Sequence, residues 1–238
     1  MPDMEKLVAG AQELDIQLTA EQVALFRQYQ ELLLEWNKRM NLTAVRDAEQ
    51  IQQRHFVDSL RCSLATGDLN GQRLIDVGSG AGFPGLPLKI LFPDLRLSLL
   101  ESTGKKAKFL QAVVDELELP DVRILGGRAE DLGQIEEERE NYDWAVARAV
   151  ARLESLVEYL LPFVRIGGQV LMQKGRQAEL EMDAAANGIA VLGGGAPELI
   201  PVQAVEQEEP SYLVLIEKIK ATPEKYPRRA GIPAKRPL

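Results

Sequence analysis

The sequence is poor in the residues that carry metal and thiol chemistry. Its 238 residues include one cysteine and one histidine, and only 5% of them are aromatic. Cys62 cannot form an internal disulfide, and without further cysteine or histidine residues we expect no zinc site. A Ser–His–Asp triad would have to use His55, and no G-x-S-x-G turn accompanies it. The sequence leaves the role of His55 open.

Long apolar runs are also missing from the chain. No run approaches the roughly 18 apolar residues that a transmembrane helix needs. The first residues, Met-Pro-Asp-Met-Glu-Lys, lack the basic and apolar regions of a signal peptide. We therefore expect a cytoplasmic, monomeric protein that holds no metal ion and contacts no membrane.

Negative charge prevails in the chain as a whole but not at its end. The net charge is −8 at pH 7, whereas Lys218–Leu238 holds seven basic residues and one acid, a net +6. The rest of the chain therefore carries −14. A basic tail on an acidic body indicates either a local contact with a polyanion or a merely solvated terminus, and charge alone does not distinguish them.

The most informative stretch is rich in glycine and covers Arg73–Gly85. A short apolar run fits a buried strand, and Gly78 and Gly80 follow it, where the backbone can approach a ligand closely. Glu101 ends the next apolar run, and an acid there can accept hydrogen bonds from both ribose hydroxyls of an adenosine. With Asp76 in the strand end, the pattern resembles motif I and the following acid of class I S-adenosylmethionine-dependent methyltransferases. A glycine turn without a cofactor is the alternative.

Strand and helix patterns alternate after residue 72, which predicts an α/β protein with a doubly wound, mostly parallel sheet. The expected strands are 73–77, 96–101, 122–126, 142–148 and 168–173, and the expected helices are 85–92, 104–118, 129–138, 152–161 and 176–187. Two final apolar runs, Ile189–Leu192 and Tyr212–Ile219, have no helix between them and predict an antiparallel hairpin that closes the sheet edge. This arrangement is the Rossmann-like fold of class I methyltransferases.

Three segments are expected to form one compact unit. Residues 1–71 are predicted to be a helical extension, in which Thr19 and Gln22 fit a capping box at the start of a long helix. Residues 72–220 would form the S-adenosylmethionine-binding domain, and residues 221–238 the basic tail.

The fourth expected strand ends in Ala147-Arg148-Ala149, and this sequence bears on the atom that is methylated. Methyltransferases acting on exocyclic amines carry Asn or Asp followed by Pro-Pro here, and those acting on C5 of pyrimidines need a cysteine nucleophile. Neither is present, whereas a ring nitrogen such as guanine N7 already offers a lone pair. Transfer to it would be an in-line displacement without a general base. Arg148 is then a positioning residue or a structural salt-bridge partner.

Several stretches together resemble the bacterial 16S ribosomal RNA guanine-N7 methyltransferase family, once called glucose-inhibited division protein B. They are Trp36–Thr43, Arg54–Leu60, Asp76–Gly85, Gly127–Asp131, Ala147–Ala149 and Lys225–Pro237. The resemblance implies S-adenosylmethionine as cofactor and methyl transfer to N7 of a guanine at about position 527 of 16S ribosomal RNA, free or in the 30S subunit.

The resemblance also implies a set of site residues. The cofactor contacts would be Gly78, Phe83, Ala129, Glu130 and Arg148, with Asp76, Gly80 and Glu101 beside them. Cations of the extension and the tail are expected to contact RNA phosphates, which position the RNA without reading its sequence. These cations are Lys38, Arg39, Arg46, Arg228, Arg229, Lys235 and Arg236. A small-molecule methyltransferase and a non-catalytic ribosome-binding module remain the alternatives.

Overall fold

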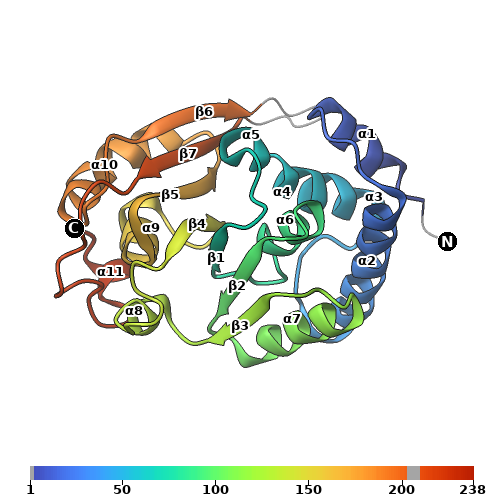
Figure 1. Cartoon of the computed structure of the whole chain (residues 1–238), viewed down its shortest axis with the longest axis horizontal. Helices are drawn as coiled ribbons and strands as arrows, with labels where there is room; N and C mark the ends of the chain where they lie inside the picture. The colour runs from blue at the N-terminus through green and yellow to red at the C-terminus, as the bar shows by residue number, and fades with distance from the viewer. Residues whose placement is uncertain (1–2, 203–209) are drawn as a thin grey trace.

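One seven-stranded sheet organises the protein (Figure 1). The computed structural model describes residues 3–202 and 210–238. The strand order is β3-β2-β1-β4-β5-β7-β6, in which β1 to β5 are parallel and β7 runs antiparallel to β5 and β6. The strands are β1 Arg73–Val77, β2 Arg96–Glu101, β3 Val122–Gly126, β4 Tyr142–Arg148, β5 Val164–Lys174, β6 Glu198–Val202 and β7 Ser211–Glu217. The predicted α/β, mostly parallel, doubly wound fold is confirmed.

Helices cover both faces of this sheet. Figure 1 shows the N-terminal helices with α6 and α7 on one face, and α8 to α11 on the other. The first group comprises α1 Glu5–Glu13, α2 Ala20–Met40, α3 Ala48–Ile51, the π-helical turn η1 Gln52–Val57, α4 Asp58–Leu60, α5 Ser63–Thr66, α6 Gly85–Leu91 and α7 Gly104–Glu116. The second comprises α8 Ala129–Leu132, α9 Leu153–Leu160, the 3₁₀ turn η2 Leu161–Phe163, α10 Ala178–Val191 and α11 Ile232–Lys235.

The strands divide the interior into two cores, because successive residues of a strand point to opposite faces of the sheet. Leu74 of β1 and Leu97 of β2 join the core beneath the N-terminal helices, α6 and α7. Ile75 and Leu100 join the core beneath α9 and α10. The N-terminal extension therefore shares one core with the sheet.

Helix α2 begins where its sequence pattern predicts, and it packs through one apolar face. The Thr19 hydroxyl accepts a hydrogen bond from the Gln22 amide, and the Gln22 side chain accepts one from the Thr19 amide, which is the predicted capping box. Phe26, Tyr29 and Leu33 on its apolar face are fully buried. Apolar spacing of three and four residues is thus core packing here.

Two predicted elements were wrong. Ile189–Leu192 is not a strand, because α10 continues through Val191 and buries Ile189 and Leu192 on one helix face. Gly193, with φ 88°, lies at the end of that helix. The hairpin partner of β7 is instead β6, whose Pro201 obscured the pattern and is tolerated because β6 is an edge strand. The helix expected at 129–138 ends at Leu132.

Cooperative unfolding should follow from the shared core. Replacing the fully buried Phe26 by alanine is expected to lower the free energy of unfolding by about 3–5 kcal/mol. Thr19→Ala, which removes only the helix cap, should lower the free energy of unfolding by about 1 kcal/mol. Denaturant unfolding followed by far-UV circular dichroism and tryptophan fluorescence should give coincident single transitions. A separate early transition for Phe26→Ala would show that the extension folds independently.

Candidate cofactor and substrate site

The glycine loop after β1 lies against the acid at the end of β2. Gly78, Gly80 and Gly82 all have positive φ, at 73°, 61° and 95°, which side chains rarely tolerate. The Gly80 amide donates to Glu101 Oε2 at 3.0 Å, while Glu101 Oε1 accepts from the Thr103 amide at 2.7 Å. A Cβ on Gly80 would meet only the Gly78 carbonyl oxygen, at 3.8 Å, so the backbone there borders open space. The glycine loop after β1 and the acid at the end of β2, which the sequence predicted to form one cofactor site, are therefore adjacent.

Asp76 has one satisfied and one unsatisfied carboxylate oxygen at the end of β1. The side chain is fully buried, and Oδ2 accepts a hydrogen bond from the Gly85 amide at 2.9 Å. Oδ1 has no partner among the described residues. Burial raises the pKa of this carboxyl to about 7, since desolvation disfavours the charged form. A buried acceptor without a partner fits a ligand that brings a donor or a positive charge.

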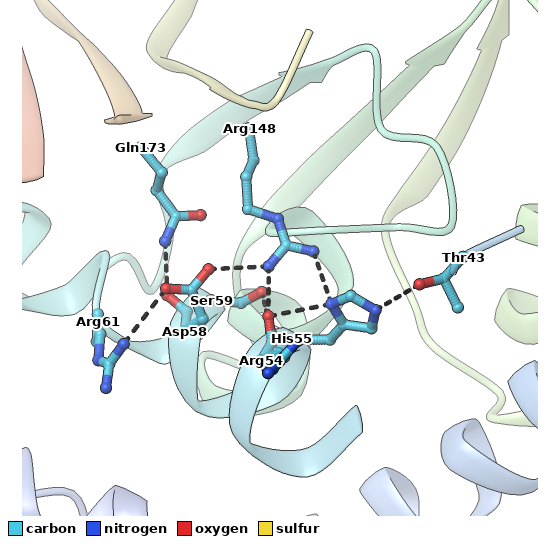
Figure 2. Close-up of polar contacts among 8 residues, drawn as sticks. All are labelled: Thr43, Arg54, His55, Asp58, Ser59, Arg61, Arg148 and Gln173. Carbon is cyan, nitrogen blue, oxygen red and sulfur yellow. Dashed lines mark hydrogen bonds and ion pairs between the residues drawn. The ribbon is translucent and has the colours of Figure 1, made fainter. Parts of the chain in front are cut away.

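Arg148, at the end of β4, is the centre of a cluster that links the sheet to the N-terminal helices (Figure 2). Its Nη1 donates to Asp58 Oδ2 at 3.0 Å and to the Arg54 carbonyl oxygen at 3.1 Å. Its guanidinium carbon lies 4.9 Å from the centroid of the Phe83 ring, which is cation–π geometry. The guanidinium is thus held on one side by the extension and on another by the glycine loop.

His55 lies on the same Phe83 ring. The two rings stack with centroids 4.7 Å apart, and His55 Nε2 lies 2.7 Å from Thr43 Oγ1. Thr43 is fixed in turn by Asn37, whose side chain bonds both its amide and its carbonyl group. Burial, with a further contribution from the charge of Arg148, lowers the pKa of His55 to about 4. His55 is therefore neutral at pH 7 and packed between Phe83 and Thr43.

Tyr29 of α2 contacts the glycine loop. Its hydroxyl donates to the Ala81 carbonyl oxygen, and its ring stacks on Phe83 with centroids 5.5 Å apart. The sequence patterns predicted no site role for Tyr29, Thr43 or Asp58. No local pattern reveals these contacts, because each joins residues that are distant in the chain.

Glu130 and the tail meet at the other end of the site. Ala129 and Glu130 are buried at the start of α8, and Glu130 Oε1 accepts a hydrogen bond from the Gly231 amide at 2.9 Å. The tail thus packs beside the expected cofactor residues. Arg228 is engaged in this packing, because it donates to both carboxylate oxygens of the fully buried Glu158.

The other expected RNA-contacting cations are exposed. They are Lys38, Arg39, Arg46, Arg229, Lys235 and Arg236. Within the described part of the chain, Arg39 forms only a solvent-exposed pair with Glu35, with an N–O distance of 3.6 Å. A phosphate could replace such a partner easily, but not the buried partner of Arg228. The RNA contacts of all seven cations remain predictions, and exposed Arg229 is a better probe of them than Arg228.

Neither a metal centre nor a membrane-spanning helix is found among the described residues. No group of three or more His, Cys, Asp or Glu side chains in residues 3–202 and 210–238 is arranged to hold a metal ion. Within the same residues, no helix is long and apolar enough to cross a membrane.

The sequence profile of the family described as rRNA small subunit methyltransferase G matches residues 22–208. This chain belongs to that family. A family member from Alkaliphilus metalliredigens is 48% identical over 229 residues, which make up 96% of each chain. Another from Roseiflexus castenholzii is 49% identical over 235 residues, covering 99% of this chain and 100% of the relative. The family resemblance read from the motifs is confirmed.

Solved structures of more distant proteins agree on the fold. A tRNA (m1A58) methyltransferase from Aquifex aeolicus is similar with a TM-score of 0.51 and 18% identity, covering 69% of each chain. A predicted O-methyltransferase from Agrobacterium tumefaciens is similar with a TM-score of 0.52 and 20% identity, covering 69% of this chain and 82% of that one. The predicted class I methyltransferase fold is therefore confirmed.

The single histidine makes its titration a direct probe of the site. In tag-free protein, the imidazole C2–H resonance of His55 should titrate with a pKa of about 4 instead of the usual 6.5. Because the pKa of His55 is lower in the folded protein than in the unfolded chain, neutral His55 contributes to the free energy of unfolding. This contribution is complete above pH 6.5 and is lost as pH falls through about 4. Arg148→Gln should raise this pKa, since the neighbouring charge is removed. A pKa near 6.5 in the folded protein would contradict the buried, stacked position.

Proposed function

We propose that this protein transfers the methyl group of S-adenosylmethionine to N7 of a guanine at about position 527 of 16S ribosomal RNA. Membership of the rRNA small subunit methyltransferase G family supports the reaction class and an RNA substrate. The observation that carries the proposal in the structure is the contact of the Gly80 amide with Glu101, beside the unpartnered Asp76 Oδ1.

The residues at the strand ends fit this cofactor. Glu101 would accept hydrogen bonds from the ribose hydroxyls, and the loop from Gly78 to Gly80 would let the cofactor approach the backbone. Asp76 would supply an acceptor near the amino acid part, and Ala129 with Glu130 would edge the adenine. When bound, the sulfonium of S-adenosylmethionine supplies an electrophilic methyl group. Phe83 and Arg148 would border the space in which that group is presented.

The chemistry asked of the protein is positioning and exclusion of water. Guanine N7 carries no proton, so no general base is needed, and His55 is held neutral beside Arg148. A guanidinium that donated to N7 would block the attacking lone pair. We therefore assign Arg148 to the cofactor or to guanine O6 alone. Its bond to Asp58 Oδ2, which holds the guanidinium in place, supports a positioning role. The proposal also entails a cytoplasmic location, where the ribosome is assembled.

Product mapping tests this proposal. Ribosomal RNA from cells that lack the protein would be incubated with it and tritiated S-adenosylmethionine, as naked RNA and as 30S particles. Borohydride–aniline treatment, which cuts RNA at N7-methylguanine, should give one new cut near position 527 of the small-subunit RNA. Label without a cut would reject N7 as the acceptor, and no label on any RNA would reject the enzyme assignment.

A further inference from the structure

A second space lies at the carboxyl edge of the sheet, beyond Arg148. It is a cavity of about 990 Å³. Arg148 and Ala149 after β4 line it, together with Gln173 of β5 and Tyr212 of β7. Residues of α1 and η1, among them Arg54, form the opposite wall. The cavity therefore abuts the same arginine that borders the glycine loop.

The polar groups on its walls are incompletely paired. Arg54 and Lys6 line the cavity, and neither side chain has an ion-pair or hydrogen-bond partner among the described residues. Gln173 Nε2 donates to the Asp58 carbonyl oxygen at 2.6 Å, which fixes the amide and leaves Oε1 buried without a partner in the described chain. Figure 2 shows that Oε1 lies on the side of Arg148. A buried, unpaired acceptor such as Gln173 Oε1 can accept a hydrogen bond from a ligand.

The backbone beside Arg148 also departs from ordinary geometry. Ala149 has φ 55°, in the left-handed region that alanine rarely adopts. Such strain persists only where the surroundings enforce it, and it is concentrated at functional sites. Ala149 lines the cavity next to Arg148, so the strained residue lies at the junction of the two spaces.

We propose that this cavity receives one unstacked guanosine nucleotide of the substrate RNA, with the base directed toward Arg148. The proposal rests on the proposed function and names the place of its substrate. Ligand pockets commonly measure roughly 300–1,000 Å³, so the cavity has room for a nucleotide and its flanking phosphates. A base inside a duplex cannot reach a buried methyl donor, and enzymes that modify bases take them out of the stack.

Each free group on the walls matches a part of that nucleotide. The Tyr212 ring offers a stacking surface for the base. Gln173 Oε1 can accept a hydrogen bond from N1–H or the N2 amino group, the donors of the guanine Watson–Crick edge. Arg54 and Lys6 can contact the phosphates on either side.

Four other charged side chains of the cavity are already paired. Asp58 holds Arg148 and Arg61, and Lys174 pairs with Glu181 at 2.8 Å. The unpaired charges of Arg54 and Lys6 are therefore available to an anion, although Glu13 on α1 also lines the cavity and limits the positive potential. Arg54 belongs to the motif Arg54–Leu60, in which Asp58 binds Arg148 and His55 lies against it. One helical segment thus serves both spaces.

Two paired substitutions test the cavity in methylation assays. Tyr212→Ala should raise the KM for 16S ribosomal RNA about tenfold, while Tyr212→Phe, which keeps the ring, should not. Arg54→Gln should raise this KM several-fold and flatten the salt dependence, and Arg54→Lys should restore most of the loss. All four variants should bind S-adenosylhomocysteine as the wild type does. Arg96→Gln, at the opposite edge of the sheet, is the control and should leave KM unchanged.

A binding measurement separates this proposal from the proposed function. In the presence of S-adenosylhomocysteine, guanosine 5′-monophosphate should shift the backbone amide resonances of Gly10 and Gly175, which line the cavity. Tyr212→Ala should remove the shifts, and ribose 5-phosphate should not reproduce them. If the wild type methylates RNA but neither the shifts nor the KM changes appear, the cavity proposal is overturned and the function stands. If ribose 5-phosphate gives equal shifts, only a phosphate is bound and the base pocket is rejected.

Discussion

The contact between the Arg148 guanidinium and the Asp58 carboxylate is the interaction on which the site depends. It joins the end of β4 to the N-terminal extension across 90 residues of sequence, and both side chains are largely buried, with 15% and 18% of their surfaces exposed. Burial removes solvent screening and makes the loss of one partner costly. The pair therefore fixes the extension and the sheet relative to each other beside the candidate site.

Strand order explains why this contact lies where a ligand is expected to bind. In the order β3-β2-β1-β4-β5, the chain reverses direction across the sheet between β1 and β4, and ligands bind at the carboxyl ends of strands at such a switch point. A Cβ on Gly78 after β1 would lie 2.7 Å from Val150 after β4, so the two strand ends are in close contact. Arg148 contacts the Phe83 ring of the glycine loop and also lines the cavity, so it borders both spaces.

The sequence predicted what local patterns determine. Spacing and residue type predicted the glycine loop, the capping box at Thr19, the five parallel strands and the basic tail. The strand β6 was missed because Pro201 disrupts its pattern, and an apolar helix end at Ile189 imitated a strand. The anchoring of Arg228 by Glu158 was not foreseeable, because it joins residues 70 positions apart. The roles of Thr43, Asp58 and Tyr29 depend on tertiary packing in the same way.

A double-mutant cycle on Asp58 and Arg148 tests the central claim most directly. The affinity for S-adenosylhomocysteine would be measured by calorimetry for the wild type, Asp58→Asn, Arg148→Gln and the double variant. If the extension acts on the cofactor site through this pair, the two losses should be non-additive, with a coupling of about 1 kcal/mol or more. Additive losses, or an unchanged affinity in Asp58→Asn, would contradict the account.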